Sequence, residues 1–397
     1  MKSRSECGPN APIRLGISGL GLAGSFMIRA AIQDPRILLI AAADPLPRPR
    51  EAFARDFEAR AYDDFAALCR DPNIDAVYIA SPHRLHAVQA VRALAHGKAV
   101  LVEKPLALSL AECDTIIEAA NQSGLPVIVG HTHAFDPGIR EMYRILQSGA
   151  LGRLGMILAF NYTDFIYRAH AGDEFDPQRG GGIILNQVTH QIEVVRLLAG
   201  GMVRSVRAQL GALDPARPAD GNCMAFLQFE GGAAASLIYS GYDFFDSDEL
   251  HDWVAEGGTS KEQGQQGRTR ATFAKRDIAE NVAHEALAYG GRVLPTEQPF
   301  LPHFGIVIVT GEKGEMRLSP NGIYIYDSDG ARELPIARGR FRAGQGNALD
   351  ALWGALREGR PTVHTARWGK ATLEVALAIR RSAQERREVM LSHQVPS

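Results

Sequence analysis

Short apolar runs alternate with amphipathic stretches through the first third of the chain. The apolar runs are Ile13–Ser18, Ile37–Ala43, Ala76–Ala80, Ala99–Val102 and Pro126–Gly130. Continuous apolar runs of this length are typical of strands that are buried on both faces of a parallel sheet. Helical patterns separate many of them, at Ser25–Gln33, Phe65–Arg70, His86–His96 and Leu108–Gln122. This alternation predicts right-handed βαβ units, and therefore an α/β domain with a doubly wound parallel sheet over residues 13–130.

The pattern changes after residue 130, which predicts a second α/β domain over residues 131–397. Apolar-rich strands are expected at Met156–Tyr162, Val203–Leu210, Cys223–Phe229, Ala233–Ser240 and Gly305–Thr310. Gly231-Gly232 fits a tight hairpin between two of these strands. The run Leu185–Ala199 has a helical core stripe, and its polar positions Asn186, His190 and Glu193 share another face, which is expected to meet solvent or a cleft. A structural helix is expected at about Ala366–Arg387.

Length and charge narrow the class of protein. A chain of 397 residues suggests two or three domains. A formal net charge of -2 argues against a general nucleic-acid binder, and no apolar run is long enough for a membrane span. The four cysteines contain no CxxC pair, which favours a reducing, cytoplasmic location without structural zinc. Residues 1–12 lack the apolar core of a signal peptide and are expected to form a loose tail.

A glycine-rich segment follows the first predicted strand and opens a helix. It has the sequence Gly19-Leu20-Gly21-Leu22-Ala23-Gly24, the GxGxxG order of a dinucleotide-binding turn. The pyrophosphate is expected on the helix N-terminus, in contact with this segment. The second strand ends at Asp44, twenty residues after Gly24, where a carboxylate accepts hydrogen bonds from ribose hydroxyls and repels a 2′-phosphate. The sequence therefore predicts NAD rather than NADP, although Arg48 and Arg50 leave a phosphate contact open.

Two further loops are expected at the same edge of the sheet, because the carboxyl ends of parallel strands meet there. One loop carries Ser81, Pro82, His83 and His86, and the other carries Glu103, Lys104 and Pro105. Ligands of open α/β sheets bind at this edge. Lys104 is therefore expected beside the nicotinamide end of the dinucleotide, and the residues of both loops are expected to help bind it.

These motifs resemble the Gfo/Idh/MocA oxidoreductase family, which includes glucose–fructose oxidoreductase and inositol dehydrogenase. The resemblance rests on Glu103-Lys104-Pro105 after a strand, on Ser81–His86 upstream and on the early GxGxxG turn. It implies a second domain with an open, largely antiparallel mixed sheet, which often joins subunits into a homodimer or homotetramer. It also implies an active site that includes Lys104 and a motif matched here by Gly180–His190.

The chain departs from the family pattern at two positions. His190 matches the family histidine, but Asn186 stands where an aspartate is usual, and Ala134 stands where an arginine is common, with His131 and His133 nearby. Segments Gly241–His251, Pro302–Gly305 and Ser319–Gly322 resemble a narrower branch, the phthalate 4,5-cis-dihydrodiol dehydrogenases. That branch implies a carboxylated aromatic cis-dihydrodiol as substrate. Its carboxylates would need cationic partners, and the candidates are Arg168, His170 and Arg179, with His133 as a further substrate residue.

The expected reaction is oxidation of a ring secondary alcohol. An ordinary histidine pKa near ~6.5 suits a base at neutral pH better than the ~10.4 of a lysine. His190 is therefore expected to accept the hydroxyl proton, oriented by Asn186, while Lys104 hydrogen-bonds the hydroxyl and stabilises developing alkoxide. A sugar or inositol dehydrogenase and a non-catalytic NAD sensor remain alternatives. The long polar stretch from Asp243 to Phe300 is expected to form a lid or a subunit arm.

Overall fold

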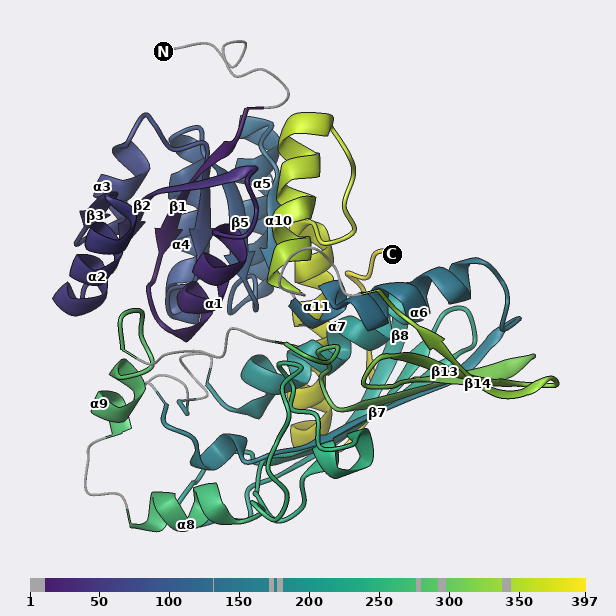
Figure 1. The fold of residues 1–397 in the computed structure, drawn as a ribbon. Coiled ribbons are helices and arrows are strands. Elements are labelled where there is room, and N and C mark those ends of the chain that lie inside the picture. The colour runs from purple at the N-terminus through teal and green to yellow at the C-terminus, as the bar shows by residue number, and fades with distance from the viewer. Residues whose placement is uncertain are drawn as a thin grey trace. The chain divides into compact units, whose positions relative to one another are not determined.

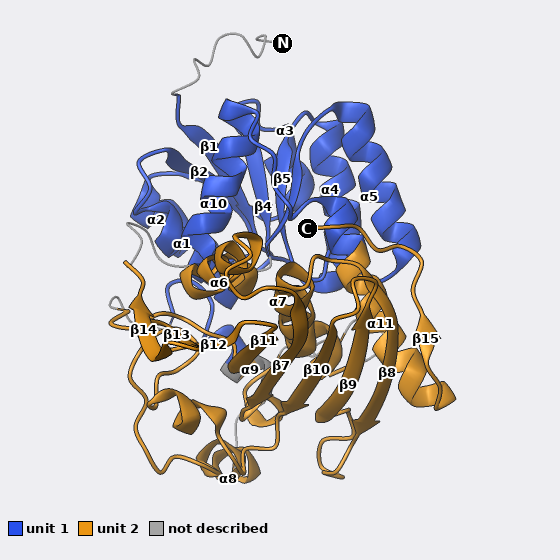
Figure 2. Ribbon diagram, turned by 90° about the vertical axis from the view of Figure 1, so that its right-hand side faces the viewer, with its two compact units in different colours: residues 1–130, 284–294, 340–370 blue, residues 131–283, 295–339, 371–397 orange. Residues whose placement is uncertain are grey.

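The computed structural model describes residues 11–130, 132–170, 175–176, 181–275, 280–291, 298–337 and 344–397. They form two compact units, each with its own sheet (Figures 1 and 2). The first unit comprises residues 1–130, 284–294 and 340–370, and the second comprises residues 131–283, 295–339 and 371–397. The chain thus returns to the first unit twice. The two continuous domains expected from the sequence, 13–130 and 131–397, do not include these returns. None of the helices in the described part of the chain has the length and apolar composition of a bilayer span.

The first unit contains a fully parallel sheet of six strands in the order β3-β2-β1-β4-β5-β6. The strands are β1 (Ile13–Ser18), β2 (Ile37–Ala43), β3 (Arg60–Tyr62), β4 (Ala76–Ile79), β5 (Ala99–Glu103) and β6 (Val127–Gly130). Figure 2 shows helices α1 and α10 on one side of this sheet and helices α4 and α5 on the other. The expected doubly wound sheet is confirmed, and the apolar run Ala99–Val102 is fully buried in it.

The helices of the first unit follow the expected alternation, with additions. They are α1 (Leu22–Ala31), α2 (Pro47–Phe57), α3 (Phe65–Arg70), α4 (His86–Ala95), α5 (Leu110–Ser123) and α10 (Gln345–Trp353). Helix α1 begins three residues earlier than expected, inside the glycine turn. Its N-cap is Gly21, which has no side chain to cap the helix, so backbone N–H groups of the first turn face the end of the sheet.

The second unit contains a mixed sheet of nine strands in the order β14-β13-β12-β11-β7-β10-β9-β8-β15. The strands are β7 (Leu154–Tyr162), β8 (Val203–Gly211), β9 (Asn222–Phe229), β10 (Ala234–Ser240), β11 (Ile306–Gly311), β12 (Gly314–Leu318), β13 (Gly322–Asp327), β14 (Gly330–Pro335) and β15 (Val389–Met390). Only the β10–β7 pair is parallel among these strands. The expected open and largely antiparallel sheet is confirmed, including the hairpin at Gly231-Gly232, where Gly232 has φ +86°.

Helices cover one face of the second sheet (Figure 2). They include α6 (Pro137–Gln147), α7 (Thr189–Leu198) and α11 (Ala366–Glu385), and the last of these begins in the first unit. The strands at 314–335 and helix α6 were not expected, because polar and aromatic residues interrupt the apolar runs there. The stretch from 243 to 300 includes the 3₁₀ turn η7 (Ser247–His251) and the short helices α8 (Arg268–Ala274) and α9 (Glu280–Glu285).

Candidate active site

The glycine turn has the shape of a cradle for a dinucleotide. Gly19 has φ +91°, and a Cβ atom there would lie 2.5 Å from the carbonyl oxygen of Ala80. A Cβ atom on Gly24 would lie 2.2 Å from the oxygen of Gly19. At Gly21, by contrast, an added Cβ atom would meet no atom within 4 Å. Two glycines are thus required by packing, whereas Gly21 opens onto space where a pyrophosphate can approach the backbone and the N-terminus of α1. Leu22 and Ala23 form the first turn of that helix.

Asp44 is held in place by the turn that it faces. Its Oδ2 atom accepts the backbone N–H of Leu20 at 2.7 Å, and its Oδ1 atom accepts that of Leu46 at 2.9 Å. Arg50 donates to the carbonyl oxygens of Asp44 and Pro45, so its guanidinium is engaged with the backbone of this loop. A fixed carboxylate fits the ribose hydroxyls of NAD and repels a 2′-phosphate. The residues of the first unit therefore fit NAD.

A glutamine that sequence reasoning did not identify joins the ends of β1 and β4. The Oε1 atom of Gln89 accepts the hydroxyls of Ser18 at 3.0 Å and of Ser81 at 2.9 Å. Gln89 lies three residues after His86, on the buried face of α4. The helical spacing was a signal that could have found it, since residues three apart share a face.

The loop around Lys104 is held by two residues of β4 and α4. The Tyr78 hydroxyl donates to Oε1 of Glu103 at 2.6 Å, and Oε2 of Glu103 accepts the Lys104 backbone N–H at 3.3 Å. The His86 ring is fully buried, with Nδ1 2.7 Å from the Pro105 carbonyl oxygen and Nε2 2.9 Å from that of Ser81. Glu103 and His86 thus shape the loop, and their polar atoms are engaged within the protein. Tyr78, inside a buried strand, gave no sequence signal.

The remaining residues expected at this edge lie on the same loops. Pro82 is exposed, and His83 begins the 3₁₀ turn η2 (His83–Leu85) that leads into α4. The Lys104 side chain is half-buried, directly after β5. The expectation that the loops after β1, β4 and β5 meet at one edge is consistent with the strand order, in which these strands are neighbours.

The helix that carries His190 differs from the expectation. Its N-terminal part is a π-helical turn (Ile184–Val188) that continues into α7, and all ten residues of α7 are buried. Of the two expectations for this polar face, solvent or a cleft, exposure to bulk solvent is therefore wrong. Glu193 is fully buried and accepts the hydroxyl of Thr372 in α11 at 2.7 Å, and Thr372 in turn accepts from Arg196 at 2.7 Å. Helix α11 covers this face of α7, so the polar residues of the face form a buried hydrogen-bond network.

His190 belongs to a cluster of rings in the second unit. Its ring centroid lies 4.7 Å from that of His133, edge to face, and 4.7 Å from that of Phe304. The side-chain amide of Asn186 donates to the carbonyl oxygen of Gly182 at 2.9 Å, just before the π-helical turn. The cluster brings together His190 and His133, which the sequence places 57 residues apart.

His133 is clamped between two carboxylates. Its Nδ1 atom lies 2.8 Å from Oδ2 of Asp136, and its Nε2 atom lies 3.1 Å from Oε1 of Glu256. Burial opposes the positive charge, but the two carboxylates outweigh it and raise the pKa of His133 to about 10. Both ring nitrogens then donate, and the ring is an imidazolium at neutral pH. Glu256 was not expected from the sequence, because it comes from a loop 123 residues away.

The expected cationic residues fall into different environments. Arg168 forms an ion pair with Asp164 at 2.6 Å, and the Arg168 side chain is 42% exposed. His170 is buried between the rings of Phe165 and Phe175, and its Nε2 atom lies 2.7 Å from the Phe165 carbonyl oxygen. These contacts assign His170 to the packing of this turn. His131 and Arg179 lie outside the described residues.

Comparison with known proteins agrees with both units. Residues 13–131 match the family profile described as an oxidoreductase family with an NAD-binding Rossmann fold, and residues 139–251 match the GFO/IDH/MocA C-terminal domain. The chain belongs to the GFO/IDH/MocA oxidoreductase family. It is an NAD-dependent enzyme that acts on CH–OH groups, a dehydrogenase of ring alcohols.

Its relatives include named dehydrogenases. The chain is 35% identical over 384 residues to a 1-carboxy-3-chloro-3,4-dihydroxycyclohexa-1,5-diene dehydrogenase of Comamonas testosteroni, over 92% of this chain and 94% of that protein. It is 28% identical to the trans-1,2-dihydrobenzene-1,2-diol dehydrogenase of Sus scrofa, over 57% and 68% of the two chains. A crystal structure described as a dehydrogenase from Bordetella bronchiseptica RB50 superposes with a TM-score of 0.92 at 41% identity, over 96% of this chain and 100% of the other.

Proposed function

We propose that this enzyme oxidises a carboxylated aromatic cis-dihydrodiol to the corresponding catechol. The similarity to the carboxylated diene-diol dehydrogenase of Comamonas testosteroni over almost the whole length of both chains is the observation that carries the proposal. The Arg168 side chain, which is 42% exposed, supports it, since a guanidinium attracts an anionic substrate.

When NAD⁺ is bound, its nicotinamide ring supplies the acceptor for a hydride. The residues of this chain have three tasks in the proposed reaction. His190 accepts the proton of the substrate hydroxyl, and Lys104 hydrogen-bonds that hydroxyl and stabilises the developing alkoxide. The His133 ring packs edge to face against His190, with the ring centroids 4.7 Å apart, and helps to hold that ring in place.

Asn186 can support His190 in fewer ways than the aspartate that is usual at its position in the family. An amide orients a neighbouring ring, whereas a carboxylate also stabilises a positive charge on it. We infer that Asn186 stabilises a positive charge on His190 less than an aspartate would. The ketone that is produced by one oxidation of a cis-dihydrodiol tautomerises to a catechol, and the gain of aromaticity makes the overall conversion effectively irreversible.

Arg168 is proposed to bind the carboxylate of the substrate. Its guanidinium shares its charge with Asp164 but keeps exposed N–H donors. Arg168→Gln should raise KM for a carboxylated cis-dihydrodiol by about 10–100-fold. KM for the same diol without a carboxylate should change by less than about twofold. Equal effects on both diols would contradict this role.

A substrate panel tests the proposed function. The purified enzyme with NAD⁺ is given a phthalate-type cis-dihydrodiol, an uncarboxylated cis-dihydrodiol, inositols and aldoses, and reduced nicotinamide is followed by absorbance. The highest kcat/KM is expected for the carboxylated cis-dihydrodiol, with the catechol as product by mass spectrometry. Faster oxidation of an inositol or an aldose would overturn the proposal in favour of the polyol branch of the family.

We further propose that the open face of the second sheet joins copies of this chain into a homodimer or homotetramer. Strand register places Met156, Met224 and Phe226 on this face, and they are 55%, 60% and 44% exposed. An apolar surface of this kind is typical of an interface. Phe226→Glu should shift the mass measured by light scattering from an oligomer to a monomer, while Glu118→Lys, an exposed control on helix α5 of the first unit, should not. A monomeric native enzyme at micromolar concentration would refute it.

A further inference from the structure

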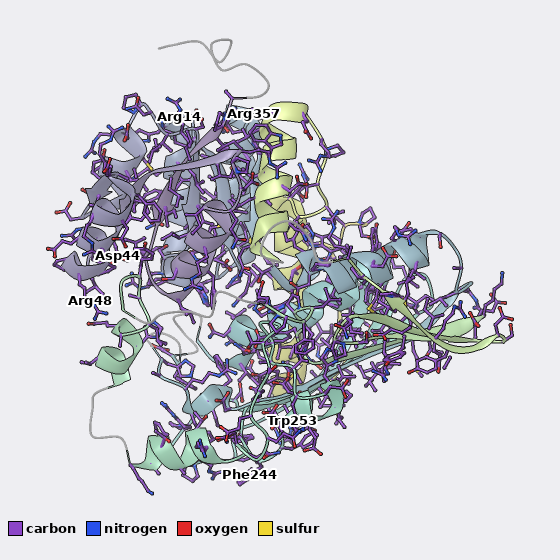
Figure 3. All side chains as sticks on the ribbon, in the orientation of Figure 1. Arg14, Asp44, Arg48, Phe244, Trp253 and Arg357 are labelled. Atoms are coloured by element: carbon purple, nitrogen blue, oxygen red, sulfur yellow. The ribbon has the colours of Figure 1, made fainter. Side chains whose placement is uncertain are left out.

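Residues 284–291, here called the strap, belong to the first unit although they follow a long stretch of the second. Turns hold the strap together, since Leu287 N–H donates to His284 O at 2.9 Å and Gly291 N–H donates to Ala288 O at 3.0 Å. The strap lies at the end of the sheet where the glycine turn opens. Figure 3 shows Asp44 and Arg48 at this end of the first unit.

The strap is attached directly to the glycine turn. The backbone N–H of Tyr289 donates to the carbonyl oxygen of Leu20 at 2.8 Å. The N–H of the same Leu20 donates to Oδ2 of Asp44 at 2.7 Å. Leu20 therefore links the strap to the carboxylate that is placed for the ribose, and a shift of its peptide groups would move both partners.

Tyr289 is also anchored on helix α2. Its hydroxyl donates to Oδ2 of Asp56 at 3.0 Å, and its ring centroid lies 6.3 Å from that of Phe53 and 6.0 Å from that of Phe57. Phe53 is fully buried. The tyrosine thus connects the glycine turn to a helix that follows Asp44 by three residues.

Two glycines shape the strap where it meets α2. Gly290 has φ +75°, and a Cβ atom there would lie 2.6 Å from Cβ of Ala52 in α2. A Cβ atom on Gly291 would lie 2.3 Å from the carbonyl oxygen of Ala286, within the strap itself, and 2.4 Å from a guanidinium nitrogen of Arg48. Gly290 is therefore required for close packing of the strap on α2, and Gly291 is required for the turn of the strap.

We propose that the strap is a further part of the dinucleotide site, in which Tyr289 positions the glycine turn and Asp44 for NAD. The inference rests on NAD binding by the family and is independent of the identity of the alcohol. Binding is reciprocal: if the docked strap favours NAD, bound NAD must stabilise the docked strap by the same factor.

Substitutions on both sides of the Tyr289–Asp56 hydrogen bond test the inference. Binding of NAD⁺ to the full-length protein is measured by titration calorimetry, without any alcohol. Tyr289→Phe and Asp56→Ala should each raise Kd by about 3–10-fold, since such a bond contributes about 1 kcal/mol. The double variant should resemble the single ones, because both changes remove the same bond. Tyr289→Ala should raise Kd further.

Proteolysis provides a second measurement. Saturating NAD⁺ should slow chymotrypsin cleavage after Leu287 or Tyr289 about tenfold. Cleavage after Phe244, whose side chain is 72% exposed in the second unit, should be unchanged and serves as the internal control. If Kd stays within twofold in Tyr289→Phe and Asp56→Ala, or if NAD⁺ gives the strap no protection, the inference is overturned. Both measurements use NAD⁺ without an alcohol, so a failure of the proposed alcohol oxidation would not change their interpretation.

Discussion

The imidazole of His86 lies 2.7 Å from the carbonyl oxygen of Pro105, the residue that follows Lys104. The other ring nitrogen lies 2.9 Å from the Ser81 carbonyl oxygen, so one buried ring connects the loops after β4 and β5. Burial lowers the pKa of His86, and the ring is neutral at neutral pH. A neutral ring carries one N–H, so it can donate to only one of the two carbonyls.

Two conservative substitutions distinguish these contacts. Asparagine at position 86 places its amide near the Nδ1 position and keeps a donor to Pro105, whereas glutamine reaches toward Ser81. If His86 positions Lys104, His86→Asn should retain more kcat than His86→Gln, with KM for NAD⁺ changed less than kcat. Steady-state kinetics and thermal unfolding of both variants provide the check. Equal kcat in two equally stable variants would assign His86 to packing alone.

Removal of the Lys104 amine should affect the reaction and spare cofactor binding. Lys104→Met is expected to lower kcat by about 10²–10⁴-fold, because the amine is proposed to stabilise the developing alkoxide. The Kd for NAD⁺ should stay within a few-fold. Lys313→Met, in an exposed turn after β11, is the matched control and should behave as the native enzyme. Near-native kcat in Lys104→Met would remove this lysine from the mechanism.

His190→Ala should also lower kcat by about 10²–10⁴-fold, through loss of the proposed proton acceptor. The distinguishing measurement is the pH profile, in which the acidic limb of kcat/KM should disappear in the variant. His393→Ala removes an exposed histidine of the same unit and should keep the native profile. An unchanged acidic limb in His190→Ala would show that another group accepts the proton.

Two glycines of the glycine turn, Gly21 and Gly24, are expected to have different roles, one in NAD⁺ binding and the other in the stability of the fold. Gly21→Ala should leave the free energy of unfolding nearly unchanged, because a methyl group there meets no protein atom within 4 Å, yet it should weaken NAD⁺ binding strongly. Gly24→Ala places a methyl group 2.2 Å from a backbone oxygen and should destabilise the fold by more than ~2 kcal/mol. Urea unfolding and calorimetry on both variants check this contrast. Similar stability of the two would contradict the packing argument.

The clamp on His133 predicts a pH-dependent contribution to stability. Its pKa is raised from 6.5 to about 10, so the folded protein holds a proton that the unfolded chain releases. The stabilisation is complete below about pH 6.5 and is lost as the pH rises through about 10. Urea unfolding of the native protein and of His133→Gln should therefore differ most near pH 6 and converge toward pH 10. A constant difference would refute the charged clamp. His393→Gln is the exposed control.

The sequence by itself determined the nucleotide chemistry and five of the six strands of the first sheet, whereas the short edge strand β3 was not expected. Continuous apolar runs define buried parallel strands, and the glycine turn and Asp44 lie within about thirty residues of one another, so local order is enough to read them. Glu103-Lys104-Pro105 was identified for the same reason, since its position follows from the end of one strand. Apolar-rich runs likewise predicted strands β7–β11 of the second sheet, whereas β12–β15 were not expected.

Only the tertiary structure decided which polar groups meet. The face of α7 that carries Glu193 resembles a surface in sequence, but α11 covers it with Thr372. His133 is paired first with Asp136, three residues away, but its second carboxylate is Glu256, which is 123 residues away. Leu20 meets a tyrosine that lies more than 250 residues further along the chain. Such pairs carry no local periodicity. They arise when separate segments are buried together, because each buried donor and acceptor then needs a partner that the fold brings to it.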